Sequence, residues 1–73
     1  MEKLIDILKG IRPDIDIENK NLVDEGILDS FDIVTLVSEL IDAYGIELSV
    51  EDILPENFNS VESILNLVES KKQ

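Results

Sequence analysis

The apolar residues between positions 30 and 45 recur with the spacing of one face of an α-helix. This face comprises Ile33, Leu36, Val37, Leu40, Ile41 and Tyr44. They stand at i, i+3, i+4, i+7, i+8 and i+11, a pattern typical of a helix that packs one side against a core. Asp29 can accept a hydrogen bond from a first-turn N–H group, and Gly45 can end the helix. The spacing therefore predicts a helix from residue 30 to residue 44.

Two more segments with helical periodicity lie near the ends of the chain. The first has its apolar face at Met1, Leu4, Ile5, Leu8 and Ile11. Its end is predicted by Gly10 and Pro13, since neither residue favours continuing a helix. The last has its apolar face at Val61, Ile64, Leu65 and Val68. We expect it to begin at Asn59 or Ser60, and the lysines near its C-terminal end suit the negative end of its dipole.

Between these helices the sequence predicts a long loop and one short helix. Residues 14–28 lack a helical period and form the loop, with apolar anchors at Ile15, Ile17, Leu22, Val23, Ile27 and Leu28. The short helix is expected over Val50 to Leu54, ended by Pro55. No strand alternation of useful length appears. The prediction is an all-α, four-helix bundle of three main helices and a short third one, forming a single domain over residues 1–73.

Composition excludes several classes of function. The chain has no cysteine and no histidine, which removes the usual thiol nucleophile, general base and zinc ligands. It has seventeen acidic and six basic residues, and the stretch from Asn21 to Ser70 contains twelve carboxylates and no base. Such a surface repels nucleic acid and anionic lipid and attracts a basic protein surface. An acidic surface also favours solubility in general, which is the simpler interpretation.

Hydropathy gives no sign of a membrane segment. No apolar run approaches the roughly 20 residues needed to span a bilayer, and no signal segment opens the chain. We therefore expect a soluble, cytoplasmic protein without membrane insertion. We also expect it to be a monomer.

Ser30 lies at the start of the predicted second helix, directly after Asp29. Its hydroxyl is expected to be exposed at the junction of loop and helix. A phosphate attached there would meet unpaired backbone N–H groups and the positive end of the helix dipole, so the position favours a phosphodiester. The same serine could instead serve only to cap the helix, because Ser and Asp are both common at helix starts.

Phe31 falls nearly opposite the apolar face of this helix, at about 100° per residue. It shares the polar side with Thr35, Ser38 and Asp42, and Val34 lies at the flank. Packing within the bundle does not explain a large aromatic side chain there. An exposed apolar patch inside an acidic rim is typical of a partner-docking surface. The alternative is that the long first loop folds over Phe31.

The motif Asp29-Ser30-Phe31 resembles the Asp-Ser-(Leu, Met or Phe) motif of the acyl, peptidyl and D-alanyl carrier proteins. The order of helices and loop is similar to this family over essentially the whole chain. The resemblance implies that Ser30 receives 4′-phosphopantetheine from coenzyme A through a Mg²⁺-dependent transferase. The thiol of that arm would then carry cargo as a thioester. The protein would be a carrier with no catalytic residue and no metal site of its own.

The resemblance also implies a set of partner enzymes. They are a phosphopantetheinyl transferase and an adenylating ligase or other acyl-loading and acyl-transfer enzymes. The predicted docking residues are Asp29, Phe31, Asp32, Val34, Thr35, Glu39, Glu51 and Asp52. Among them, Asp29, Phe31 and Asp32 are expected to be read by the transferase.

Gly26 bears on the kind of carrier. It stands four residues before Ser30, whereas fatty-acid-type carriers typically have a glycine three residues before the serine. The spacing here is more similar to D-alanyl and related stand-alone carriers, which an adenylating ligase loads with acyl or aminoacyl cargo. The residues leave the pathway open between D-alanylation-like, polyketide or nonribosomal, and fatty acid chemistry.

Two alternatives come from other classes. The acids at positions 14, 16, 18 and 25 match four positions of a calcium-binding loop, but Asn19 replaces its required glycine and Pro13 precedes it where a helix should. A calcium site is therefore not predicted. The alternative function is an unmodified helical adaptor that uses Phe31 and the acidic face only to bind other proteins.

Overall fold

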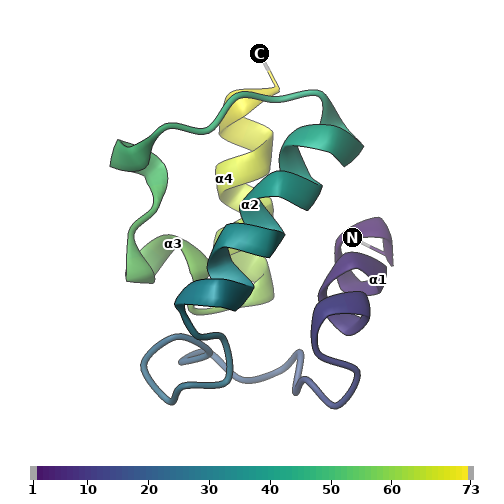
Figure 1. The fold of residues 1–73 in the computed structure, drawn as a ribbon, viewed down its shortest axis with the longest axis vertical. Coiled ribbons are helices and arrows are strands. Elements are labelled where there is room, and N and C mark those ends of the chain that lie inside the picture. The colour runs from purple at the N-terminus through teal and green to yellow at the C-terminus, as the bar shows by residue number, and fades with distance from the viewer. Residues whose placement is uncertain (1, 73) are drawn as a thin grey trace.

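The computed structural model describes residues 2–72, and every regular element within them is helical. In chain order the elements are α1 (Glu2–Ile11), α2 (Ser30–Tyr44), the short 3₁₀ helix η1 (Val50–Asp52), α3 (Pro55–Phe58) and α4 (Val61–Lys71). Helix α1 packs against α2 and α4, and α3 packs against α4. The loop from α1 to α2 passes beneath the helices in Figure 1. The all-α bundle predicted from the sequence is confirmed.

The core draws apolar side chains from the four α-helices and from the loops between them. Its buried members are Leu4, Leu8, Ile15, Leu22, Leu28, Ile33, Leu36, Leu40, Ile46, Phe58, Val61, Ile64, Leu67 and Val68. No polar or charged residue is buried within residues 2–72. Burial of apolar surface is therefore the main stabilising contribution, since the bundle has no disulfide to constrain the chain.

The boundaries of α1 and α2 agree with the sequence prediction. Helix α2 begins at Ser30 after the N-cap Asp29, and it ends at Gly45, which has the left-handed φ of 63°. The Gly45 N–H donates to the Ile41 carbonyl at 2.9 Å, which closes the last turn. Met1, predicted on the first apolar face, lies outside the described residues.

The prediction for the third helix is right in its start and wrong in its end. Only Val50–Asp52 is helical there, as one 3₁₀ turn, and Pro55 begins α3 instead of ending a helix. A proline suits the first position of a helix, because that residue has no intrahelical N–H bond to lose and its φ is already helical. The shift matters for the core, since α3 supplies the fully buried Phe58.

Two apolar faces also differ in detail from the prediction. Ile41, predicted to be buried, is 38% exposed. It follows Leu40 by one residue and so lies about 100° round the helix, on the flank of the core. On α4, Leu67 is buried and Leu65 only partly so. Leu67 follows Ile64 by three residues, so the helical period could have identified it.

The long loop is held to the helices by buried side chains. Ile15, Leu22 and Leu28 insert into the core, and Leu22 and Leu28 are almost wholly buried. The Leu28 N–H donates to the Leu22 carbonyl at 2.9 Å, which folds residues 22–28 into a compact turn. This turn delivers the chain to the start of α2. No helix among the described residues is long and apolar enough to cross a membrane.

The contrast between Leu36 and Ile41 gives a test of this packing. Leu36→Ala should lower the free energy of unfolding by about 2–5 kcal/mol, because it empties a fully buried site. Ile41→Ala should cost about 1 kcal/mol or less, as is usual for a partly exposed side chain. Urea unfolding followed by circular dichroism measures both. Equal losses would contradict the placement of Ile41 on the flank of the core.

Candidate functional site

The first turn of α2 is closed by a reciprocal pair of hydrogen bonds between two aspartates. The Asp32 backbone N–H donates to Asp29 Oδ1 at 2.9 Å, and the Asp29 N–H donates to Asp32 Oδ2 at 3.3 Å. The Ile33 N–H also donates to the Asp29 carbonyl at 2.9 Å. This capping box fixes Asp29 as the N-cap and Ser30 as the first helical residue, as the sequence predicted.

Ser30 is exposed and stands beside an open cavity of about 440 Å³. Apart from Asp29 and Ser30 at its edge, this cavity is lined by Val23, Gly26, Leu28, Ile33, Val34, Ile53, Leu54, Pro55 and Phe58. The lining is almost entirely apolar and comes from the first loop, α2 and the segment from η1 to α3. A group attached to Ser30 can therefore reach either solvent or an apolar surface.

Asn59 holds the loop that leads to Ser30. Its side-chain oxygen accepts hydrogen bonds from the backbone N–H groups of Val23 and Asp24, at 2.9 and 3.1 Å. Its carbonyl accepts a further bond from the Leu22 N–H at 2.8 Å. Asn59 thus joins the turn before α2 to the junction of α3 and α4. The sequence pattern indicated Asn59 only as a possible start of the last helix, and this role was not predicted.

Arg12 is the second positioning residue that the sequence analysis missed. Its Nε donates to Asp32 Oδ2 at 2.7 Å, and its Nη2 lies 3.6 Å from Asp29 Oδ2. Arg12 directly follows α1, so these contacts tie the end of α1 to the start of α2. They also place one positive charge between two carboxylates that would otherwise repel each other. The position of this single base among acidic residues is the only signal that could have indicated it.

Arg12 and Asp32 each shift the pKa of the other. Burial raises the pKa of Asp32, but the hydrogen bonds from the Arg12 guanidinium and from the Asp29 N–H outweigh it, so this pKa lies below its ordinary value. The hydrogen bond to Asp32 in turn raises the pKa of Arg12. Both groups stay charged at neutral pH.

The apolar docking candidates are displayed next to Ser30. Phe31 is 83% exposed and Val34 is 67% exposed, so the first loop does not cover Phe31. Thr35 and Glu39 are exposed further along α2. These four side chains and Ser30 thus project from a single helix.

The other acidic candidates are placed differently. Asp32 is only 15% exposed at its side chain and is bound by Arg12. Asp52 pairs with Lys71 at 3.0 Å and accepts hydrogen bonds from Ser49, which lowers its pKa. Because Lys71 lies in the last turn of α4, this pair ties η1 to the end of α4. The next residues, Ile53 and Leu54, line the cavity beside Ser30, whereas Glu51 and Asp52 do not.

The acidic loop at residues 14–25 has a local structure of its own. The Asp16 carboxylate accepts from the Glu18 N–H at 3.1 Å, and Glu25 accepts from the Asn19 side chain at 2.9 Å. Across residues 2–72, no group of three or more acidic side chains is arranged to hold a metal ion.

The sequence was also compared with known proteins. A family model described as a phosphopantetheine attachment site matches residues 2–68. The chain belongs to this family. Searches of curated proteins and of solved structures each give no match. Members of the family carry a covalently attached 4′-phosphopantetheine and are generally not catalysts themselves.

The start of α2 fits the phosphodiester end of such an arm. Within residues 2–72, the first-turn N–H groups of Asp32 and Ile33 are paired, whereas those of Ser30 and Phe31 have no protein acceptor. These donors and the helix dipole favour an anion at this position. Arg12 offsets the negative charge of the nearby carboxylates of Asp29 and Asp32. Once bound, the arm would supply a thiol, which this cysteine-free chain lacks.

The lowered pKa of Asp32 predicts how stability responds to acid. Because this carboxyl binds a proton more weakly in the folded state, it stabilises the fold fully above its unfolded pKa of about 3.9. That contribution is lost as the pH falls through the lower folded-state value. In urea unfolding between pH 7 and pH 2.5, Asp32→Asn should be less stable than the parent at neutral pH, and the difference should narrow towards the acid end.

Asp42→Asn is the control, since Asp42 is exposed on the same helix and takes part in none of the ion pairs among residues 2–72. It should leave the acid limb of the stability curve unchanged. An Asp32→Asn curve parallel to that of the parent at all pH values would contradict the proposed ion pair.

Proposed function

We propose that the chain is an acyl carrier protein whose Ser30 hydroxyl bears the phosphopantetheine arm. The observation that carries this proposal is the exposed Ser30 at the first position of α2, inside the region that the family model matches. The capping box and Arg12 hold this position, and unpaired N–H groups face it. The arm would carry acyl or aminoacyl cargo as a thioester between partner enzymes, and the chain itself would not catalyse a reaction.

The proposed docking surface is the outer face of α2 around Phe31 and Val34. Both apolar side chains are exposed, and the charged residues of α2 and its N-cap are all acidic, including Asp29 and Glu39. An aromatic anchor within a polar rim is the usual organisation of a strong contact between proteins. Partners that read this surface would be the phosphopantetheinyl transferase and the enzymes that load or remove the cargo.

The proposed subclass rests on the position of Gly26, four residues before Ser30. Gly26 has a left-handed φ of 76°, and its N–H donates to the Val23 carbonyl at 3.0 Å. A glycine is favoured at this turn because other residues rarely adopt such a φ. The spacing from Gly26 to Ser30 is thus a property of the folded loop. We propose, on the resemblance of this spacing to D-alanyl and related stand-alone carriers, that an adenylating ligase loads the arm.

The direct test is the mass of the protein after reaction with coenzyme A. Incubation with coenzyme A, Mg²⁺ and a broad-specificity phosphopantetheinyl transferase should add one phosphopantetheine group. Ser30→Ala should abolish the gain in mass, and Ser38→Ala, an exposed serine on the same helix, should not. Modification that persists in Ser30→Ala would refute the assignment. A parent chain that stays unmodified would favour the adaptor function.

A second test separates docking from folding at Phe31. Phe31→Ala should change the free energy of unfolding by no more than about 0.5 kcal/mol, because the side chain is exposed. It should lower kcat/KM of the transferase at least about tenfold, since aromatic anchors often contribute about 2 kcal/mol or more to an interface. Ile41→Ala, also on α2 but distant from Ser30, is the control for transfer. An unchanged kcat/KM in Phe31→Ala would remove the proposed anchor.

A further inference from the structure

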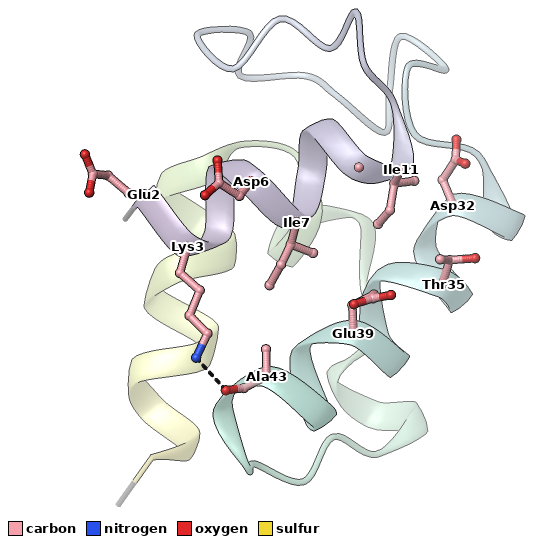
Figure 2. A pocket seen from close by; sticks show the side chains of 10 residues that line it. Glu2, Lys3, Asp6, Ile7, Ile11, Asp32, Thr35, Glu39 and Ala43 are labelled. Carbon is pink, nitrogen blue, oxygen red and sulfur yellow. Dashed lines mark hydrogen bonds between the residues drawn. The ribbon is translucent and has the colours of Figure 1, made fainter.

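A second open groove runs between α1 and α2, on the other flank of α2 from the cavity beside Ser30. Its volume is about 830 Å³. Figure 2 shows Ile7 and Ile11 on the α1 side and Thr35 and Glu39 on the α2 side. The residues that α2 contributes, Asp32, Thr35, Glu39 and Ala43, recur at i, i+3, i+7 and i+11 and so share one flank of the helix. Ser30 and Val34 line the cavity on the opposite flank.

The groove combines an apolar floor with a negative rim. Ile7, Ile11 and Ala43 supply apolar surface, and all three are only partly buried. Four carboxylates also line it, those of Glu2, Asp6, Asp32 and Glu39. Asp32 is paired with Arg12, but no ion pair among residues 2–72 involves the other three.

The one amine in the groove is already used within the fold. Lys3 Nζ donates to the Ala43 carbonyl at 2.8 Å, as Figure 2 shows, and lies 5.0 Å from the centre of the Tyr44 ring. It caps the C-terminal end of α2, where a cation is favoured. The groove therefore keeps an excess of negative charge that the described part of the chain does not neutralise.

Gly10 is an independent sign of an occupant. It lies in the last turn of α1 and lines the groove. Its φ is not left-handed, so the backbone does not require glycine. A Cβ at this position would meet nothing within 4 Å, so internal packing does not require it either. Glycine disfavours a helix relative to alanine or leucine. Glycine near a helix end can help to terminate it, but α1 continues through Gly10 to Ile11. The missing side chain leaves the groove open to close approach by another molecule.

We propose that the groove between α1 and α2 binds a cationic amphipathic segment of a partner protein. Lysine or arginine side chains of that segment would meet Glu2, Asp6 and Glu39, and its apolar residues would cover Ile7 and Ile11 beside Gly10. A second copy of the chain would bring the same negative charge, at −11 per copy. Nucleic acid and anionic lipid would be repelled for the same reason. The groove lies on the opposite flank of α2 from Ser30 and shares Glu39 with the acidic rim around Phe31 and Val34.

The experiment is a titration of the ¹⁵N-labelled full chain with a synthetic helical peptide that has leucines on one face and lysines on the flanks. A control peptide replaces the leucines with serines at equal charge. The leucine peptide should bind more tightly and shift the amide signals of residues 6–11 and 35–39. The titration is repeated with Ser30→Ala, which lacks the proposed attachment hydroxyl. Binding of the peptide should be the same with either chain, since the groove does not use the arm.

Charge-matched variants test the rim. Glu2→Gln with Glu39→Gln should weaken binding roughly three- to tenfold, the range of two solvent-exposed ion pairs. Glu18→Gln with Glu56→Gln removes the same charge outside the groove and should have little effect. Equal weakening by the two double variants would overturn the proposal in favour of non-specific attraction. Amide shifts confined to the face of Phe31 and Val34 would also overturn it. So would sedimentation that shows the free chain to associate with itself.

Gly10→Leu tests the floor with two readouts of opposite sign. Leucine favours a helix more than glycine does and meets open space, so the melting temperature should rise. The same side chain would occupy the groove, and binding of the leucine peptide should weaken by roughly tenfold, a steric cost typical of an overfilled site. A stabilised Gly10→Leu chain that binds the peptide as well as the parent would overturn the proposal.

Discussion

The ion pair between Arg12 and Asp32 joins the two parts of the chain on which the site depends. It connects the residue after α1 to the first turn of α2 across twenty positions of sequence. Asp32 is at the same time half of the capping box that makes Ser30 the first helical residue. Arg12 thus links the end of α1 to the start of α2 and places a cation beside two close carboxylates. Without this cation, their repulsion would oppose the geometry that presents Ser30.

Local patterns and long-range contacts differ in how far the sequence predicts them. The limits of α2 follow from Asp29, Gly45 and the helical period, all of which act within a few residues. The contacts of Arg12 and Asn59 cross 20 to 36 positions, and no local period encodes them. Pro55 was misplaced for another reason, since a proline can begin a helix as well as end one, and the position of Phe58 in the core decides between them.

Helix α2 carries two chemically distinct flanks. One faces the apolar cavity beside Ser30, and the other faces the acidic groove along α1. Phe31 lies on the ridge between them and is exposed to solvent. In so small a bundle a single helix must both build the core and display every group that partners recognise. The core therefore uses one face of α2. The two flanks and the outer face that carries Phe31 stay open for binding.

The distribution of bases explains why the outer face of α2 remains acidic. Lys3 caps α2 at Ala43, Arg12 pairs with Asp32, and Lys71 pairs with Asp52. Lys72 Nζ lies 5.9 Å from the centre of the Tyr44 ring, which Lys3 also approaches. Each of these cations is placed at a helix end, where it offsets a dipole or a capping carboxylate.

None of the ion pairs among residues 2–72 reaches Glu39 or Asp42, the carboxylates along the middle of α2. The repulsion between these exposed charges lowers stability, and a partner that brings cations to α2 relieves it. The same charges that weaken the free bundle thus contribute to the free energy of association.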